Sequence, residues 1–154
     1  PTPIGNIVLD FLKGNTKIYM DGGFNLVDVA VVAESIVSAI EHGKNGESYI
    51  IGNENITLRE LYKMLSEISG VDQPKIKIPF PIAFAGAFAV NVLSKLRGKQ
   101  PAATPKKVIA LYYKYAYCDS NKAREALRLR HVPSRETLTK TAEWFKNNGY
   151  ISTR

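Results

Sequence analysis

Cysteine is nearly absent from this 154-residue sequence, and histidine is almost as rare. The single cysteine, Cys118, excludes an internal disulfide, and the two histidines, His42 and His131, stand far apart with no Cys/His cluster around either. A zinc site needs several such ligands at short spacing, so the sequence argues against a metal centre. A chain without disulfides fits a reducing compartment, and we expect a cytoplasmic protein.

The sequence also lacks the short motifs of a complete nucleotide-binding enzyme. It has no Gly-x-Gly-x-x-Gly or Gly-x-x-Gly-x-x-Gly loop and no phosphate-binding lysine motif. No tyrosine is followed four residues later by a lysine, the spacing that places both groups on one helix face. Since no nucleophile–base pair stands out either, we assign no catalytic residue to the chain.

No apolar run is long enough to cross a bilayer. The longest, residues 78–90, contains two prolines and is shorter than the ~18 residues required, so we expect no transmembrane segment. A basic cluster follows at 95–99, and an apolar helix beside such a cluster also suits peripheral binding to anionic lipid. A lipid-associated module built on helix 82–96 is therefore one alternative function.

Charge is unevenly distributed along the chain. Residues 1–94 carry 7 basic and 10 acidic side chains, whereas residues 95–154 carry 14 basic and 4 acidic ones. A basic half suggests an anionic neighbour, although a solvated charged face is the plainer explanation. A nucleic-acid-binding module is a second alternative; we rank it last and expect no nucleic-acid partner, because that function explains only the charge.

The apolar pattern predicts one mixed α/β (α+β) domain, rich in helix and with a few short strands. Strands too few for a self-sufficient sheet alternate with helices, and no internal repeat is present. Helices are expected near 4–13, 29–41, 57–69, 82–96, 104–112, 121–127 and 134–148, and strands near 16–20, 24–29, 48–53, 75–78 and 114–118.

Two of these helices carry strong amphipathic patterns. The helix near 57–69 begins with a capping box, Thr57 to Glu60, and has one apolar face, Leu58, Leu61, Tyr62, Leu65 and Ile68. In the helix near 29–41, Glu34, Ser35, Ser38 and Glu41 lie opposite an apolar stripe formed by Val29, Val32, Ala33, Ile36, Val37 and Ile40. Ser134 is expected to cap the last helix, and Asp119 or Ser120 the one before it.

The stretch "LYYKYAYCDSNKA", residues 111–123, invites a functional interpretation. Tyr113, Tyr115 and Tyr117 alternate, so on a strand they share one face. Aromatics interleaved with basic residues can stack on bases, but aromatic residues are favoured in strands whatever they bind. We therefore interpret these tyrosines as packing residues and Cys118 as a small core residue.

The order of segments resembles a known family. The series "NLVDVAVVAESIVSAIEHGKNGESYIIGNENITLRELYKMLSEISG", then "AYCDSNKAREAL", then "AEWFKNNGYI", is similar to the C-terminal half of extended short-chain dehydrogenases/reductases, the NAD-dependent epimerase/dehydratase enzymes. The dihydroflavonol-reductase-like and hopanoid-associated sugar epimerase branch is the most similar. The resemblance covers essentially the whole chain.

This resemblance implies that cofactor binding and substrate binding lie in different domains. The family's cofactor loop and its Tyr-x-x-x-Lys pair belong to an N-terminal Rossmann domain, which binds NAD or NADP and which these 154 residues do not contain. Residues 1–154 would then be the C-terminal substrate-binding domain, which closes over the nicotinamide and selects a sugar or a hydrophobic carbonyl substrate. The chain alone would bind no cofactor and be inactive, and a homo-oligomer is possible.

The resemblance also implies where substrate would bind. The cleft would be lined by residues 1–5, the strand around 25–28 and the helix 82–96. The candidate substrate-binding residues are Thr2, Pro3, Asn25, Asp28, Phe84 and Phe88.

The sequence departs from the family pattern in three places. Ala30 and Val31 replace acidic residues, so the capping role falls to Asp28 or goes unfilled. Phe24 stands where nucleotide-sugar enzymes commonly have a diphosphate-binding arginine, which favours a hydrophobic, sterol-like ketone over a nucleotide sugar. Arg128 and Leu129 replace a usual Gly-aromatic pair.

Overall fold

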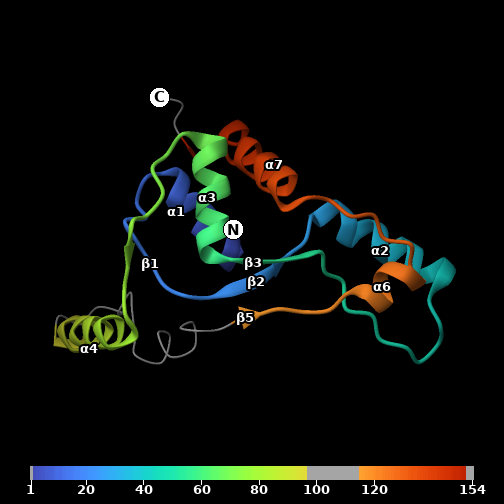
Figure 1. Cartoon of the computed structure of the whole chain (residues 1–154), viewed down its shortest axis with the longest axis horizontal. Helices are drawn as coiled ribbons and strands as arrows, with labels where there is room; N and C mark the ends of the chain where they lie inside the picture. The colour runs from blue at the N-terminus through green and yellow to red at the C-terminus, as the bar shows by residue number, and fades with distance from the viewer. Residues whose placement is uncertain (1, 97–114, 152–154) are drawn as a thin grey trace.

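The computed structural model describes residues 2–96 and 115–151 and confirms a mixed α/β fold that is rich in helix (Figure 1). The expected helix at 104–112 and Tyr113 lie outside the described residues. The described elements are α1 (Pro3–Leu12), β1 (Ile18–Tyr19), β2 (Gly23–Leu26), α2 (Val29–His42), β3 (Glu54–Thr57), α3 (Leu58–Ser69), β4 (Ile76–Lys77), α4 (Phe80–Leu96), β5 (Tyr115–Ala116), α6 (Asn121–Ala126) and α7 (Ser134–Asn147).

The hydrophobic core lies where α1, α3 and α7 meet one end of a small sheet. Phe11 of α1 and Leu61 and Leu65 of α3 are fully buried there, and the rings of Phe11 and Tyr62 stack with centroids 5.6 Å apart. The strands contribute Leu26 and Ile56 and α7 contributes Leu138 and Phe145 to the same cluster.

Helix α3 forms as its sequence predicts. Thr57 Oγ1 accepts a hydrogen bond from the Glu60 backbone N–H at 3.1 Å, and the Glu60 carboxylate accepts one from the Thr57 N–H at 2.7 Å. These reciprocal bonds satisfy two N–H groups that the helix itself cannot pair. They also lower the pKa of Glu60. The helix ends at Gly70, whose φ of 72° is left-handed and suits glycine.

Two small sheets connect the helices. β2 lies between β3, to which it is antiparallel, and β5, to which it is parallel; β1 and β4 form a separate parallel pair. The three-stranded sheet joins the α1–α3–α7 cluster to a second region in which α2 and α6 lie side by side (Figure 1). Helix α4 lies apart from both regions.

Helix α2 places its apolar stripe outward, which its amphipathic pattern alone does not reveal. Val31 and Ser35 are buried at 1% exposure, whereas Ile36 and Ile40 are 63% and 82% exposed. The Ser38 hydroxyl donates a 2.6 Å hydrogen bond to the Leu127 carbonyl beside α6. The polar side of α2 therefore packs against the described chain and the apolar side is uncovered.

The strand expected at 48–53 is not formed, and this prediction is wrong for the described chain. The segment is irregular, and strand structure begins only at Glu54. The strands expected at 24–29 and 114–118 are present but shorter, as β2 and β5.

The structure confirms some of the expected helix caps and corrects one. Asp28, which is buried, caps α2 by accepting a 2.8 Å hydrogen bond from the Ala30 N–H. The Asp119 carboxylate accepts from the Asn121 N–H at 2.8 Å at the start of α6. Ser134 does not cap α7, because it is the first helical residue and follows Pro133. The cap comes instead from Glu54 of β3, whose carboxylate accepts from the Ser134 N–H at 2.8 Å.

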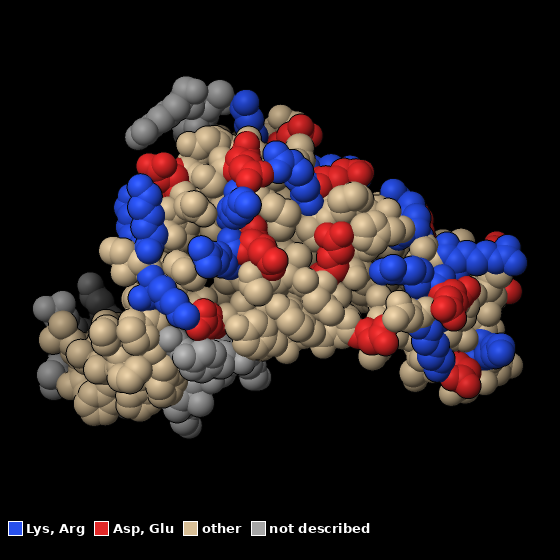
Figure 2. Space-filling model, in the orientation of Figure 1, with Lys and Arg blue, Asp and Glu red and all other residues tan. Residues whose placement is uncertain are grey.

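Ion pairs account for part of the charge asymmetry. Four lysine or arginine residues of the second half pair with acidic residues of the first: Lys122 with Glu47, Arg130 with Glu34, Arg135 with Glu67, and Lys140 with Asp28. Figure 2 shows the two signs interspersed over the helix cluster, while the region of α4 is free of either colour. On the face drawn, the described charges are mixed, as in a solvated surface.

Candidate functional site

Thr2 and Pro3 form the start of α1. Thr2 Oγ1 accepts a 3.1 Å hydrogen bond from the Gly5 N–H and so acts as the N-cap, while Pro3 occupies the first helical position, where its missing N–H costs nothing. Both residues are exposed. They therefore present a rigid helix start to solvent.

Asn25 belongs to a cluster formed by the side chains of Asn25 and Asn55 and the backbone of Asn53. Its amide donates to Asn55 Oδ1 at 2.9 Å and accepts from the Asn53 N–H at 2.8 Å. Asn55 in turn bonds both the N–H and the carbonyl of Cys118, at 3.2 and 3.1 Å. This cluster ties β2 to the segment after β5, and Asn25 is occupied by contacts within the chain.

The close packing around this cluster extends to Gly52 and Gly23. A Cβ on Gly52 would approach Asn25 Oδ1 to 2.7 Å and Cys118 Sγ to 2.8 Å. A Cβ on Gly23 would approach the Tyr117 ring to 2.6 Å. Tyr117 thus packs on the β2 backbone, as expected of a residue that serves the fold, although it remains 44% exposed. Cys118 is only half-buried, so it is not a core residue.

Asp28 holds α2 in place. Besides its capping bond it lies 3.6 Å from Lys140 Nζ of α7, and its side chain is 6% exposed. Lys140 also pairs with Glu136 at 2.7 Å, and these two acids raise the pKa of Lys140, with Glu136 the larger influence. A buried carboxylate with both a helix cap and a cation is satisfied by the protein itself.

Phe84 and Phe88 lie on α4, which is apolar nearly all round. The rings of Phe80 and Phe84 are 5.9 Å apart, and Phe84 is half-buried. Phe88 is 56% exposed, and its neighbours on the helix include four further exposed apolar side chains, Ile82, Val90, Val92 and Leu93. This helix has a broad apolar surface, with no charged residue between Phe80 and Ser94.

The structure distributes the six candidate residues over three places. Among the described residues, no hydrogen bond, ion pair or ring contact joins any two of them. Thr2 and Pro3 lie at the start of α1, Asn25 lies on β2 and Asp28 caps α2, whereas Phe84 and Phe88 lie on α4. Nothing in the described ranges 2–96 and 115–151 forms a group of three or more metal-ligating side chains. Within the described ranges, the six residues supply no acid–base or nucleophilic pair.

The structure adds a Glu54–His131–Ser134 cluster that sequence reasoning missed. His131 Nε2 lies 2.9 Å from the Glu54 carboxylate, which also accepts from Ser134. Burial raises the pKa of Glu54, but the hydrogen bonds from Ser134 and the charge of His131 outweigh burial, so the pKa lies below its usual value. The carboxylate stands between the hydroxyl residue and the imidazole, so this is a helix cap and not a nucleophile–base pair. No local sequence signal links residues 80 positions apart.

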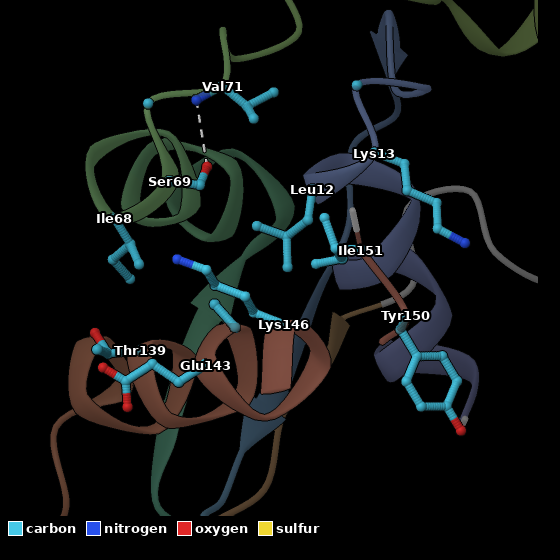
Figure 3. Close-up of a pocket in the computed structure, with 13 residues that line it drawn as sticks. Leu12, Lys13, Ile68, Ser69, Val71, Thr139, Glu143, Lys146, Tyr150 and Ile151 are labelled. Atoms are coloured by element: carbon cyan, nitrogen blue, oxygen red, sulfur yellow. Dashed lines mark hydrogen bonds between the residues drawn. The ribbon is translucent and has the colours of Figure 1, made fainter. Parts of the chain in front are cut away.

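A separate hollow of about 1080 Å³ lies where the C-terminal ends of α1, α3 and α7 converge (Figure 3). Its wall is apolar at Leu12, Ile68 and Ile151 and charged at Glu143 and Lys146. The Val71 N–H donates a 3.3 Å hydrogen bond to Ser69 Oγ at its edge. None of the six candidate residues lines it, so it is distinct from the expected cleft.

The chain is similar to known proteins in both sequence and structure. No family model matches it. A putative dihydroflavonol 4-reductase from Synechocystis is 35% identical over 100% of this chain and 46% of its own length, and sterol demethylase protein B from Methylococcus capsulatus is 27% identical over 98% and 46%. The crystal structure of gox2253 superposes with a TM-score of 0.78 at 36% identity, over 99% of this chain and 46% of that one.

In sequence and fold the chain matches the C-terminal half of extended short-chain dehydrogenases/reductases. It spans about half the length of the curated relatives it matches. A more distant member of the fold, UDP-glucose 4-epimerase from Bifidobacterium longum solved with NAD+ and UDP, has a TM-score of 0.59 at 16% identity, over 97% of this chain and 41% of that one. At that identity the likeness shows the fold alone.

The structure describes two of the residues that depart from the family pattern. Phe24 is half-buried and packs against the hydrophobic core. Arg128, which stands in place of the family's glycine, has a φ of 53°, a left-handed conformation that glycine adopts without strain.

Proposed function

We propose that these residues are the C-terminal substrate-binding domain of an NAD(P)-dependent reductase or epimerase whose Rossmann domain lies outside the 154 residues. The observation that carries this proposal is the match over the whole chain to just under half of relatives with redox names. The sequence contains neither a glycine-rich cofactor loop nor a Tyr-x-x-x-Lys pair, which fits the same division.

The proposed role of the chain is to hold the substrate and exclude water. The cofactor supplies or accepts the hydride, and the proton comes from the other domain. Phe84 and Phe88 of α4 contact the apolar part of the substrate, and Thr2, Pro3, Asn25 and Asp28 hold the backbone that borders the polar part. We expect the reaction to take place in the cytoplasm, where reduced thiols such as Cys118 persist.

The substrate that fits this surface best is a hydrophobic carbonyl compound. Five large apolar side chains of α4 are exposed, a surface that a sterol-sized molecule could cover. Two relatives carry names for such chemistry, a dihydroflavonol reductase and a sterol demethylase. A nucleotide sugar would require cationic groups, and residues 80–94 of α4 carry none.

Turnover by the full-length protein tests this proposal. We expect NAD(P)H oxidation with a steroid ketone or a dihydroflavonol and little with a UDP-sugar. Phe88→Ala should raise KM at least about tenfold, because it removes a large apolar contact. Trp144→Ala, equally exposed at 53% but on α7, should leave KM unchanged. Turnover of none of these substrates, or equal KM values for the two variants, would contradict the proposal.

The apolar surface of α4 favours one second candidate, a lipid-associated module. Among the described helices, none has the length and apolar character that crossing a bilayer requires. Interfacial binding needs less, namely an apolar surface and nearby basic groups. Its basic cluster at 95–99 lies almost wholly outside the described residues. Co-sedimentation of the full-length protein with anionic vesicles would support this candidate, and retention in the supernatant would exclude it.

A further inference from the structure

The hollow at the converging ends of α1, α3 and α7 has an apolar floor and a charged rim (Figure 3). The floor consists of half-buried apolar side chains that pack on the core, namely Leu12, Ile68, Val71 and Ile151. The rim consists of exposed side chains, namely Lys13, Glu143, Lys146 and Tyr150. An apolar surface bordered by a few polar groups is the usual composition of a small-molecule site, and about 1080 Å³ is ample space for one.

Glu143 and Lys146 are an acid and a base on one face of α7, three residues apart. Within residues 2–96 and 115–151, neither side chain makes an ion pair or a hydrogen bond. Earlier on the same helix, Glu136 and Lys140 do pair, at 2.7 Å. Figure 3 shows Lys146 extending from α7 into the space between α7 and α3. Both charges of the rim are therefore available to a ligand.

The C-terminal end of α3 adds partial negative charge to the same space. Ile68, Ser69 and Gly70 line the hollow, and the last carbonyl groups of a helix carry this charge. A basic side chain in the last turn can offset it, as Lys146 does in α7, but the last turn of α3 contains none. A cationic group of a ligand would be stabilised at this end.

We propose that the hollow binds a small zwitterion with an apolar side chain, that is, a hydrophobic amino acid. Its carboxylate pairs with Lys146, and its ammonium group lies between the Glu143 carboxylate and the end of α3. Its apolar side chain covers the floor of the hollow. A fatty acid would satisfy Lys146 but bring a second negative charge close to Glu143. None of the six candidate substrate-binding residues lines the hollow, so this site is separate from the proposed function.

Calorimetric titration of the full-length protein with L-leucine tests the class of ligand. We expect a Kd of about 1 mM or tighter, which is within reach of a ligand of this size. Isocaproate lacks the ammonium group of leucine, and isoamylamine lacks its carboxylate. Each should bind at least about tenfold more weakly, because one charged contact is lost. Absence of leucine binding, or equal affinity for either analogue, would overturn the proposal.

Two rim variants locate the site. Lys146→Gln and Glu143→Gln each remove one charge without breaking a described contact, and each should weaken leucine binding at least about tenfold. Lys63→Gln, at an exposed position of α3 that does not line the hollow, should leave the Kd unchanged. Unchanged binding in both rim variants would overturn the proposal, because leucine would then bind elsewhere. The titration needs neither NAD(P)H nor turnover, so a failure of the proposed function would be seen separately.

Discussion

Helices α3 and α2 both have an apolar stripe, but α3 buries its stripe in the core and α2 exposes its stripe to solvent. Their lengths are 12 and 14 residues. Leu61 and Leu65 of α3 are fully buried, whereas Ile36 and Ile40 of α2 face solvent. An apolar stripe thus establishes that a helix side is to be buried, but it does not establish that the burying layer lies in the same stretch of chain.

The two regions also differ in what holds them together. The α1–α3–α7 cluster is joined by a continuous apolar core. The contacts of α2 with its neighbours include a serine–carbonyl hydrogen bond and the ion pair between Glu34 and Arg130. Exposed ion pairs contribute little to stability, so we expect the α2 region to be the weaker part of the 154-residue chain.

The largest difference should come from truncating the two stripes. In the 154-residue chain, Leu65→Ala should lower the free energy of unfolding by about 2–5 kcal/mol, because it leaves a cavity in the core. Ile40→Ala, at a site that is 82% exposed, should change it by no more than about 0.5 kcal/mol. Urea unfolding measures both. Comparable losses at the two sites would show that α2 is buried after all.

Removing the Glu54 cap should have the next largest effect. Glu54→Gln weakens the carboxylate contacts to Ser134 and His131 and should cost about 1–2 kcal/mol of unfolding free energy. Glu125→Gln, on the exposed surface of α6, should change little. Denaturant unfolding of both variants at pH 7 measures the difference. Equal changes in unfolding free energy would show that the Glu54 cap does not stabilise the chain.

The same carboxylate predicts a dependence on pH. Its pKa in the folded chain lies below the ordinary value of 4.5, so its contribution to stability is complete above that pH. The contribution should be lost as pH falls below about 4.5 and through the lowered pKa. Wild-type and Glu54→Gln unfolding curves should therefore converge at acid pH. A gap that stayed constant from pH 7 to pH 3 would refute this assignment.

A smaller loss is expected at the start of α3. Thr57→Ala removes the side-chain half of the capping box and should cost about 1 kcal/mol. Thr139→Ala, at an interior position of α7, is a suitable control because its hydroxyl bonds only the preceding turn. Thermal unfolding measures both variants. Equal shifts in the Tm of the two variants would contradict the capping account.

The smallest effect should be a gain. Arg128→Gly relieves a left-handed backbone conformation and should raise the unfolding free energy by about 0.5–1 kcal/mol. Arg124→Gly, within α6, should lower it by a similar amount, since glycine weakens a helix. A loss at both positions would show that the Arg128 side chain contributes more than its backbone conformation costs.

The features that local sequence signals encode were predictable. The capping box, the stripe of α3, the stop at Gly70 and the span of α4 all depend on residues within a few positions of one another. Only part of the candidate site depends on local sequence signals. The capping role of Asp28 is local. Whether the six candidate residues form a cleft depends on how distant elements meet, and this stays a prediction.

The features that depend on distant partners were not predictable. Residues 48–53 have the composition of a buried strand, yet no described strand pairs with them. The prediction failed because composition does not reveal whether a partner strand lies nearby. The cap of α7 comes from Glu54, far along the chain, and the outward face of α2 depends on serine contacts on its other side. Tertiary context decided each of these cases.

Calorimetric titration with NADH, performed side by side on the 154-residue chain and on the full-length protein, tests the central claim most directly. The account predicts heat of binding in the micromolar range for the full-length protein and none for the 154-residue chain. Micromolar binding by the 154-residue chain alone would contradict it.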